Sequence, residues 1–238
     1  MANNTVAKLS SDNRAKLRNQ IKQYKEIAEY IDDGWGLELD KAKLVKNIHK
    51  NLMGVDELGK LRPYEDLAFF LLVARQYSLN PLKKEIYATY QRVQKNKQWV
   101  EQITPITSIH GLRKLARRSK NPRYAYTGDA ELSIDENGQI SSAKVPVYGF
   151  FGDSATPVKL GAYIAYFEEF AKTKTDKDGN TYYTGKWKTA PKMMLTKCAE
   201  ANAIRQSFDI SGIYIEEEIV DGDDKILQLG EGAEEDEK

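Results

Sequence analysis

At 238 residues, with 41% hydrophobic residues, 30% charged residues and a formal net charge of +1, the chain has the composition of a folded protein with a hydrophobic core. It contains no apolar run near the roughly 18 residues that span a bilayer and no secretory signal, so we expect a cytosolic protein. One cysteine and two histidines exclude an internal disulfide and do not suffice for a tetrahedral zinc site without carboxylates, so no structural metal is expected.

The first part of the chain is predicted to be helical. Apolar residues recur at helical spacing over residues 9–33, where the sequence DDGWG ends the pattern. A second helix is predicted over residues 40–54. Residues 62–81 begin with a proline and two acids, continue with an apolar middle and end in an Asn-Pro pair, which is typical of a buried helix.

From residue 85 the spacing of apolar residues changes from helical to alternating. Residues 85–94 and 98–107 are rich in aromatic and β-branched residues on either side of the sequence KNK, which predicts a β-hairpin. Ser108 can then cap a helix over residues 109–120 that ends at another Asn-Pro pair. Further strands are predicted near residues 124–134, 143–151 and 158–168, with a tight turn at Asn137-Gly138, and a polar loop over residues 172–190 leads into a last helix.

Antiparallel strands with segregated helices indicate an α+β fold, with an antiparallel β-sheet and hairpin. We expect N-terminal helices over residues 1–58, a single core over residues 59–215 and an acidic, disordered tail over residues 216–238. The tail contains eleven Asp and Glu against two Lys, a net charge of about −9, so the rest of the chain is near +10. A cationic body suggests a polyanionic partner such as nucleic acid, and scattered solubilising lysines are the alternative.

Enzymatic sites find little support in the sequence. There is no phosphate-binding loop of the GxxxxGK[ST] type and no GxGxxG after a strand. The sequence DKDGN at residues 176–180 lacks the first and last ligands of a calcium loop and is interpreted as a turn. Cys198 has no histidine predicted nearby and is interpreted as a core residue. Acids on several predicted strands, notably Glu101, Asp129 and Glu131, leave a metal-dependent nuclease as the main enzymatic alternative.

Basic residues gather on the predicted helix after Ser108. Its apolar side faces a core, and its other side carries Arg113, Lys114, Arg117, Arg118 and Lys120. Five cations with no intervening acid are unusual for a solvated helix, which tends to mix both signs. We therefore favour phosphate contacts here over a merely solvated face.

The last helix combines apolar and basic residues. At 100° per residue, one arc collects Met193, Met194, Cys198, Ala201, Ile204 and Phe208, and the opposite side collects Lys192, Thr196, Glu200, Gln206 and Ser207. Lys197 and Arg205 fall inside the apolar arc. A lysine can extend to solvent, whereas a buried guanidinium must meet a carboxylate, a phosphate or an open groove. Two roles are thus compatible with the sequence for Arg205: a salt bridge to a carboxylate and a bidentate contact with a phosphate.

The start of this helix is also cationic. Lys186, Lys188 and Lys192 surround Trp187, at a place where free backbone N–H groups and the helix dipole favour an anion. Trp187 either stacks on a base or packs in the core, and packing is the commoner role of a tryptophan. The sequence therefore predicts an anion-binding surface at this end of the helix.

Three segments, taken together, resemble the phage single-strand annealing proteins of the Red-beta (Bet) and RecT type, the lambda member in particular. They are FFLLVARQYSLNPLKKEIYA, PITSIHGLRKLARR and GKWKTAPKMMLTKCAEANAIRQSFDISGIY. The first carries QY, LNP and KEIYA in unbroken order, and the third carries G-x-W, P-K, M-L and a terminal G-I-Y at matching spacing. The resemblance covers roughly residues 60–215.

The resemblance implies a protein without enzymatic activity or cofactor that coats single-stranded DNA, pairs it with a complementary strand without ATP, and assembles into homo-oligomeric rings or helical filaments. It also implies a basic groove built from several elements, with Lys60, Lys84, Lys192 and Arg205 at matching positions. With the residues singled out above, the predicted DNA-binding set is Lys60, Lys84, Arg113, Lys114, Arg117, Arg118, Lys186, Trp187, Lys188, Lys192, Lys197 and Arg205.

The resemblance further implies partners and a place of action. Single-stranded DNA and annealed duplex DNA are the expected ligands, and a phage exonuclease and the host single-strand binding protein are candidate protein partners. A protein encoded by a phage or prophage would act in the cytoplasm of a bacterial host cell. Passive binding of single-stranded DNA and metal-dependent nuclease activity are the alternative functions. The acidic tail is either a solubilising extension or a competitor of DNA for the cationic groove.

Overall fold

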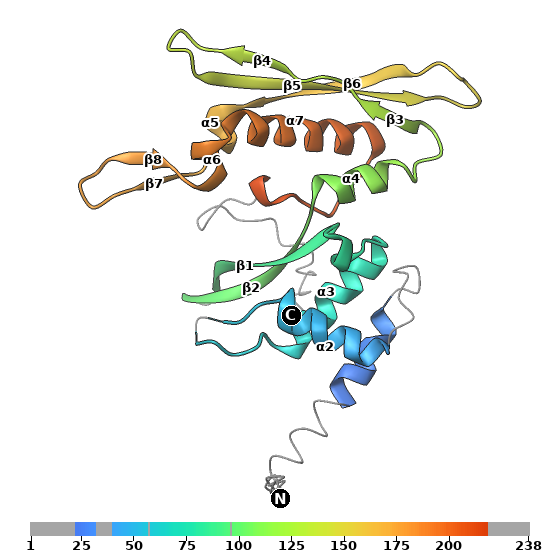
Figure 1. Ribbon diagram of the computed structural model, residues 1–238, viewed down its shortest axis with the longest axis vertical. Coiled ribbons are helices and arrows are strands. Elements are labelled where there is room, and N and C mark those ends of the chain that lie inside the picture. The colour runs from blue at the N-terminus through green and yellow to red at the C-terminus, as the bar shows by residue number, and fades with distance from the viewer. Residues whose placement is uncertain (1–21, 32–39, 57, 96, 219–238) are drawn as a thin grey trace, which may run out of the picture.

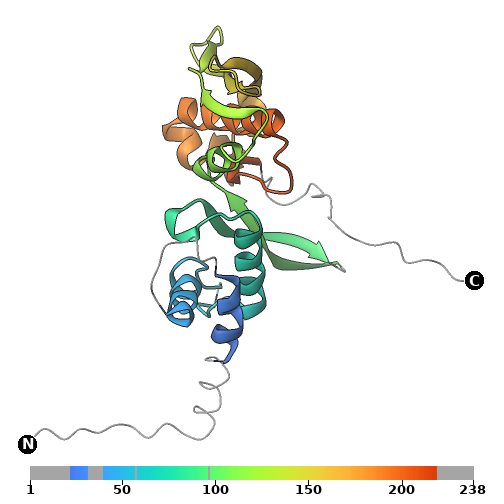
Figure 2. The ribbon, with the colours of Figure 1, turned by 90° about the vertical axis from the view of Figure 1, so that its right-hand side faces the viewer.

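The computed structural model describes residues 22–31, 40–56, 58–95 and 97–218, whose elements form two lobes along the long axis of the molecule (Figures 1 and 2). The predicted α+β fold with antiparallel strands is confirmed. Residues 9–21 of the first predicted helix lie outside the described residues, and residues 22–27 are helical and continue into the 3-10 helix η1, Ala28–Tyr30. Within the described ranges, no helix combines the length and the apolar composition of a membrane span.

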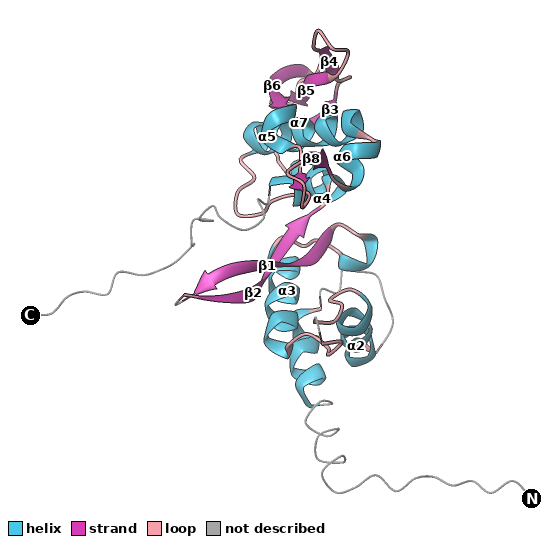
Figure 3. Ribbon diagram, turned by 90° about the vertical axis from the view of Figure 1, so that its left-hand side faces the viewer, coloured by secondary structure: helices cyan, strands magenta, loops and turns pink. Residues whose placement is uncertain are grey.

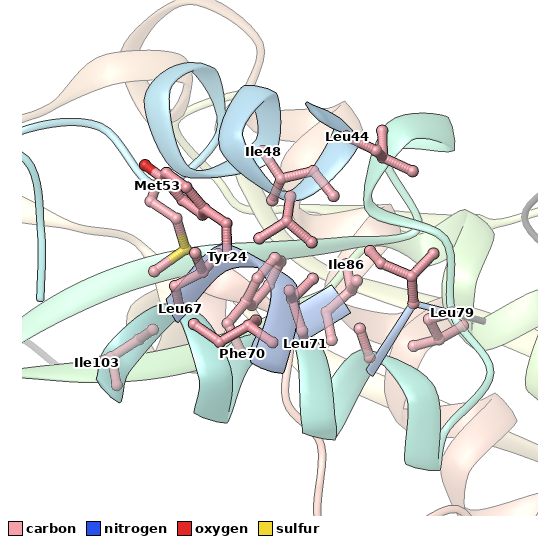
Figure 4. Close-up of a cluster of buried hydrophobic side chains, with 14 of the residues drawn as sticks. Tyr24, Leu44, Ile48, Met53, Leu67, Phe70, Leu71, Leu79, Ile86 and Ile103 are labelled. Atoms are coloured by element: carbon pink, nitrogen blue, oxygen red, sulfur yellow. The ribbon is translucent and has the colours of Figure 1, made fainter. Parts of the chain in front are cut away.

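The first lobe packs helices against a hairpin. Its elements are α2 (Lys41–Asn51), α3 (Tyr64–Gln76), the 3-10 helix η3 (Pro81–Lys83), β1 (Ile86–Lys95) and β2 (Gln98–Thr107). The two strands pair antiparallel, which confirms the predicted hairpin. Figure 4 shows the core between these elements, where Ile48 of α2, Phe70 and Leu71 of α3, and Ile86 of β1 lie together and are buried.

Helix α3 is buried on one side only. Leu67 and Phe70 are fully buried against the core, whereas Phe69 and Leu72 are each 47% exposed. The prediction of a buried helix is therefore wrong for its outer face. The segment is apolar all round, so its sequence has no polar stripe that would mark the side left uncovered by η1 and β2.

The second lobe is a sheet with α7 lying across one face (Figures 1 and 3). Its elements are α4 (Ile109–Ala116), β3 (Arg123–Thr127), β4 (Glu131–Ile134), β5 (Ile140–Phe150), β6 (Val158–Tyr166), α5 (Phe167–Phe170) and α7 (Pro191–Phe208). The central strand β5 pairs antiparallel with β6 along one edge and with β3 and β4 along the other. Ser108 caps α4 as predicted, since its hydroxyl accepts the backbone N–H of Gly111 at 3.1 Å.

The segment predicted as a polar loop contains regular structure. It forms a second hairpin of β7 (Thr173–Thr175) and β8 (Thr181–Tyr183), followed by the short helix α6 (Gly185–Thr189). Asp176 closes the hairpin turn by accepting the backbone N–H groups of Asp178 and Asn180, and this hydrogen bonding lowers its pKa. The interpretation of DKDGN as a turn is confirmed.

The two lobes are joined by the segment that follows α7. The backbone N–H of Thr107 at the end of β2 donates to the carbonyl oxygen of Tyr214 at 2.7 Å, so that Tyr214 forms a parallel bridge beside β2. On either side of this bridge, Ile213 is buried in the core of the first lobe and Ile215 in a core cluster of the second. The segment is thus anchored in both lobes.

The acidic tail begins in ordered structure. Its first residues form the 3-10 helix η4, Glu216–Glu218, and Glu217 is 6% exposed. Residues 216–218 at the start of the acidic segment therefore belong to the described structure. Residues 219–238 lie outside the described residues.

A side chain at Gly111 in α4 is expected to lower the stability of the protein. A Cβ at this position would lie 2.3 Å from both the carbonyl oxygen of Glu85 and the hydroxyl of Thr107. We expect Gly111→Ala to lower the free energy of unfolding by about 1–3 kcal/mol through overpacking, although alanine favours helices. Chemical denaturation of this variant and of Gly161→Ala, where the nearest atom is 3.5 Å away, provides the test. Equal stability of the two variants would contradict the expected clash.

Candidate nucleic-acid interface

Arg113, predicted to contact phosphate, makes an ion pair inside the second lobe. Its Nε and Nη2 donate to the two carboxylate oxygens of Glu200 at 2.6 and 2.8 Å, and the Thr127 hydroxyl donates to the same carboxylate at 3.0 Å. Glu200 is 6% exposed, and its hydrogen bond to Arg113 raises the pKa of the guanidinium. This bidentate pair fixes the guanidinium against α7. The charge of Arg113 is therefore matched by Glu200 within the fold.

Two further cations of this region tie α4 to the first lobe. Lys114 Nζ lies 2.5 Å from the Glu85 carboxylate. Arg118 donates through Nη1 to the carbonyl oxygen of Tyr77 and through Nη2 to that of Ser78 at 2.7 Å. These carbonyl groups end α3, where the negative end of the helix dipole favours a cation. The basic helix therefore connects the two lobes.

The remaining predicted cations around α4 face solvent. Arg117 is exposed, with its guanidinium carbon 5.8 Å from the ring centroid of Tyr124, and Lys120 is exposed as well. The sequence predicts a phosphate-binding face on this helix from five cations without an intervening acid. Most of that charge meets acids and carbonyl groups contributed by other elements, so α4 offers less free positive charge than its sequence indicates.

Helix α7 is buried on more sides than the predicted apolar arc. It packs against β5 and β6 on one side and against α4 on another. Glu200, expected on the solvent side, is therefore buried, whereas Met193, expected in the core, is 55% exposed. Cys198 is completely buried, and burial raises the pKa of its thiol to about 12, so the thiol stays protonated at neutral pH. The interpretation of Cys198 as a core residue is confirmed.

Trp187 packs in the core. Its side chain is 4% exposed and meets Phe167 edge-on, with ring centroids 5.8 Å apart. Packing was one of the two roles left open by the sequence, and a ring enclosed in this way has no free face on which a base could stack. The contribution of Trp187 is to anchor α6, which presents the neighbouring lysines.

Arg205 and Lys197 face the segment that follows α7. Arg205 donates to the side-chain oxygen of Asn202 at 2.8 Å and to the carbonyl oxygen of Ile213 at 3.4 Å, and burial lowers its pKa. Lys197 Nζ lies 2.7 Å from the Glu217 carboxylate. An open hollow of about 340 Å³ adjoins Arg205 and is lined by Tyr163, Glu169, Phe170, Asn202, Arg205, Tyr214 and Glu217. Arg205 thus lies beside an open hollow, which is one of the environments expected for it from the sequence.

Five of the predicted cations are exposed and make no side-chain ion pair or hydrogen bond with the part of the chain that the structure describes. They are Lys60, Lys84, Lys186, Lys188 and Lys192. The last three belong to α6 and the first turn of α7, in the second lobe. Lys60 precedes α3 and Lys84 precedes β1, both in the first lobe. The structure therefore places three of the five together on consecutive elements and the other two apart from them.

The hairpin β7–β8 adds cations that were not predicted. Lys174 pairs across the hairpin with Tyr182, and both are exposed, as is Lys177 in the turn. The hairpin contacts α6, so these lysines lie in the same part of the second lobe as Lys186 and Lys188. The signal in the sequence was the recurrence of lysine and tyrosine through the segment, which by composition alone resembles a solvated loop.

The acids named for a nuclease do not converge. Glu101 lies on β2 and pairs with Arg62 at 2.5 Å, whereas Glu131 lies on β4 in the other lobe, 3.5 Å from Lys144. Among the described residues, no three His, Cys, Asp or Glu side chains form a group that could hold a metal ion. The exposed cations are thus the features that indicate a function.

Comparison with known proteins agrees with this emphasis. The model of the RecT family matches residues 43–229, which include most of both lobes, and no curated protein matches the chain. The match is to the family as a whole, so the particular nearness to its lambda member stays a prediction. Since the matched region covers well over half of the sequence, the chain belongs to the RecT family, whose members anneal complementary single strands of DNA in phage-type recombination.

Proposed function

We propose that this protein binds the backbone of single-stranded DNA through its exposed lysines and anneals the strand to its complement without ATP or any covalent step. The observation that carries the proposal is the group Lys186, Lys188 and Lys192, which is exposed on α6 and α7 and has no partner within the described residues. Cations in this state release counterions when they meet phosphates, which is the main source of affinity for nucleic acid.

Holding the backbone leaves the bases free for pairing. The lysines would grip phosphates of one strand while its base edges face a second strand. Correct pairs then add stacking energy of about 1.4 kcal/mol per step, and mismatched segments lose it and dissociate. In this mechanism the bases provide the specificity and the protein raises the local concentration of ordered single strands.

The distribution of the exposed lysines favours an oligomer. Lys60 and Lys84 lie in the first lobe, apart from the α6–α7 group in the second. A strand that follows successive subunits meets both sets repeatedly, and each subunit then contributes only a few phosphate contacts. A ring or helical filament of this chain is the assembly that such binding requires. The exposed Phe69 and Leu72 on α3 are candidate subunit contacts.

Two kinds of partner protein fit an annealing function. A phage exonuclease that produces single strands and the host single-strand binding protein that covers them are the two chemical sources of substrate for an annealing protein. The acidic composition of residues 216–238 favours basic partners. Co-purification with either protein, before and after removal of residues 219–238, measures this contribution.

An annealing assay tests the proposed function. Two complementary oligonucleotides, one labelled with a fluorophore and the other with a quencher, are mixed with the protein in buffer without nucleotide. We expect duplex to form several times faster than without protein. Binding without acceleration would identify a passive single-strand binder, and magnesium-dependent shortening of the labelled strand would identify a nuclease; either result overturns the proposal.

A further inference from the structure

Glu217 forms an ion pair with Lys197, a cation that could otherwise bind DNA. Its Oε1 accepts a hydrogen bond from Lys197 Nζ at 2.7 Å, and its side chain is only 3% exposed. The other carboxylate oxygen, Oε2, is buried and has no hydrogen-bond partner in the described structure. A buried carboxylate with one oxygen unsatisfied is poorly compensated for its loss of water. The contact is therefore weaker than its short distance indicates.

The surroundings of Glu217 contain the elements of a nucleotide site. Arg205 and Glu217 both line the same hollow of about 340 Å³, and Lys197, two helical turns before Arg205 on α7, is paired with Glu217. Tyr214 is 48% exposed and lines the hollow, with the Arg205 guanidinium carbon 5.8 Å from its ring centroid. Arg205, the lysine held by Glu217 and an exposed tyrosine are groups that bind a phosphate and its adjoining base, and the side chain of Glu169 also lines the hollow.

A carboxylate and a phosphodiester are chemically alike where they meet a lysine. Each carries a single negative charge spread over two oxygen atoms. From these observations we propose that the hollow is a binding site for one phosphodiester of single-stranded DNA, and that Glu217 is its internal ligand, which the incoming strand displaces from Lys197. The proposal deepens the annealing function proposed above and rests on it.

Displacement requires that the acidic segment can leave while the lobes stay joined. The backbone anchor of this segment is the bond between Thr107 and Tyr214, and the buried apolar anchor is Ile215, both before η4. Glu217 lies beyond them in a three-residue 3-10 helix. Opening of η4 therefore exposes Lys197 without breaking the connection between the lobes. Wild-type affinity is lowered by the cost of this opening.

The test compares two variants that remove the same charge one residue apart. Glu217→Gln breaks the contact with Lys197, whereas Glu216→Gln changes an exposed residue of the same helix. We expect Glu217→Gln to bind oligo-dT about fivefold more tightly near 0.1 M salt, with a salt dependence of log K steeper by about 0.7, because one more phosphate is neutralised. Glu216→Gln is expected to change the affinity less and to leave the slope unaltered.

The double variant Lys197→Met/Glu217→Gln identifies the cation involved. We expect it to lose both the gain in affinity and the steeper slope, because the gained phosphate contact is made by Lys197. Equal effects of Glu216→Gln and Glu217→Gln, or an undiminished gain in the double variant, would overturn the proposal. Thermal denaturation of each variant verifies that it is folded. If the wild-type protein itself neither binds nor anneals single strands, the proposed function fails, which is a different outcome from unchanged binding by Glu217→Gln.

Discussion

Arg113→Met is expected to lower the free energy of unfolding by about 3 kcal/mol, because it leaves the buried Glu200 carboxylate without its cation. Loss of one partner from a buried pair typically costs about 3–5 kcal/mol, and the lower value applies here since the Arg113 side chain is 32% exposed. Urea denaturation followed by circular dichroism measures the change.

Arg117→Met is the matched control for this variant. It removes the same charge from the end of the same helix, but Arg117 is exposed, and its one contact among the described residues is with the aromatic ring of Tyr124. We expect its stability to stay within about 0.5 kcal/mol of the wild type. If both variants were equally stable, Glu200 would have to be satisfied without Arg113, and the division of the α4 cations into internal and exposed groups would be incorrect.

Replacement of Lys186, Lys188 and Lys192 by alanine is expected to weaken the binding of single-stranded DNA about 100-fold near 0.1 M salt. Each lost phosphate contact lowers the salt slope of log K by about 0.7, so three contacts lower the slope by about 2 and the affinity by about two orders of magnitude. Fluorescence anisotropy of labelled oligo-dT over a range of salt concentrations gives both quantities. Stability is expected to change little, since these side chains have no partner among the described residues.

A control of equal charge is available on α2. The variant Lys43→Ala/Lys46→Ala/Lys50→Ala also removes three exposed lysines, from a helix in the first lobe. Its net charge matches that of the α6–α7 variant, so long-range attraction of DNA is reduced equally. Similar losses of affinity in both triple variants would show that total charge, and not the α6–α7 lysines, determines binding.

Local features of the fold were predictable from the sequence. The hairpin of β1 and β2 follows from alternating aromatic and β-branched residues beside a short turn, and its two strands are adjacent along the chain. The Ser108 cap needs only a donor three residues away. Features of this kind depend on residues that are close together in the sequence. The predicted boundaries of these elements therefore agree with the structure to within a few residues.

The roles of the cations were not predictable because their partners are distant in sequence. Arg113 and Glu200 are separated by 87 positions, and Lys114 and Glu85 by 29. Periodicity assigns a residue to one side of a helix and does not show which element covers that side. Glu200 is an example, since helical spacing places it opposite the apolar arc of α7. In the structure α4 packs on that side and contributes Arg113, which pairs with Glu200.

The exposed lysines of α6 and α7 were predictable as a group, although Trp187 between them was ambiguous. A run of alternating lysines before a helix indicates solvated cations whatever the packing of its neighbours. The tryptophan had two chemically reasonable roles, and only contact with Phe167 decides between them. The hairpin β7–β8 was missed because its strands are three residues each, too short for alternation to separate them from a loop.

Lysine footprinting tests most directly the claim that exposed lysines on α6 and α7 hold the DNA backbone. The protein is acetylated with and without saturating oligo-dT, and the modification of each lysine is measured by mass spectrometry. We expect bound DNA to protect Lys186, Lys188 and Lys192 and to leave Lys43 and Lys46 on α2 as reactive as before. Unchanged acetylation of the first three lysines, with DNA demonstrably bound, would contradict it.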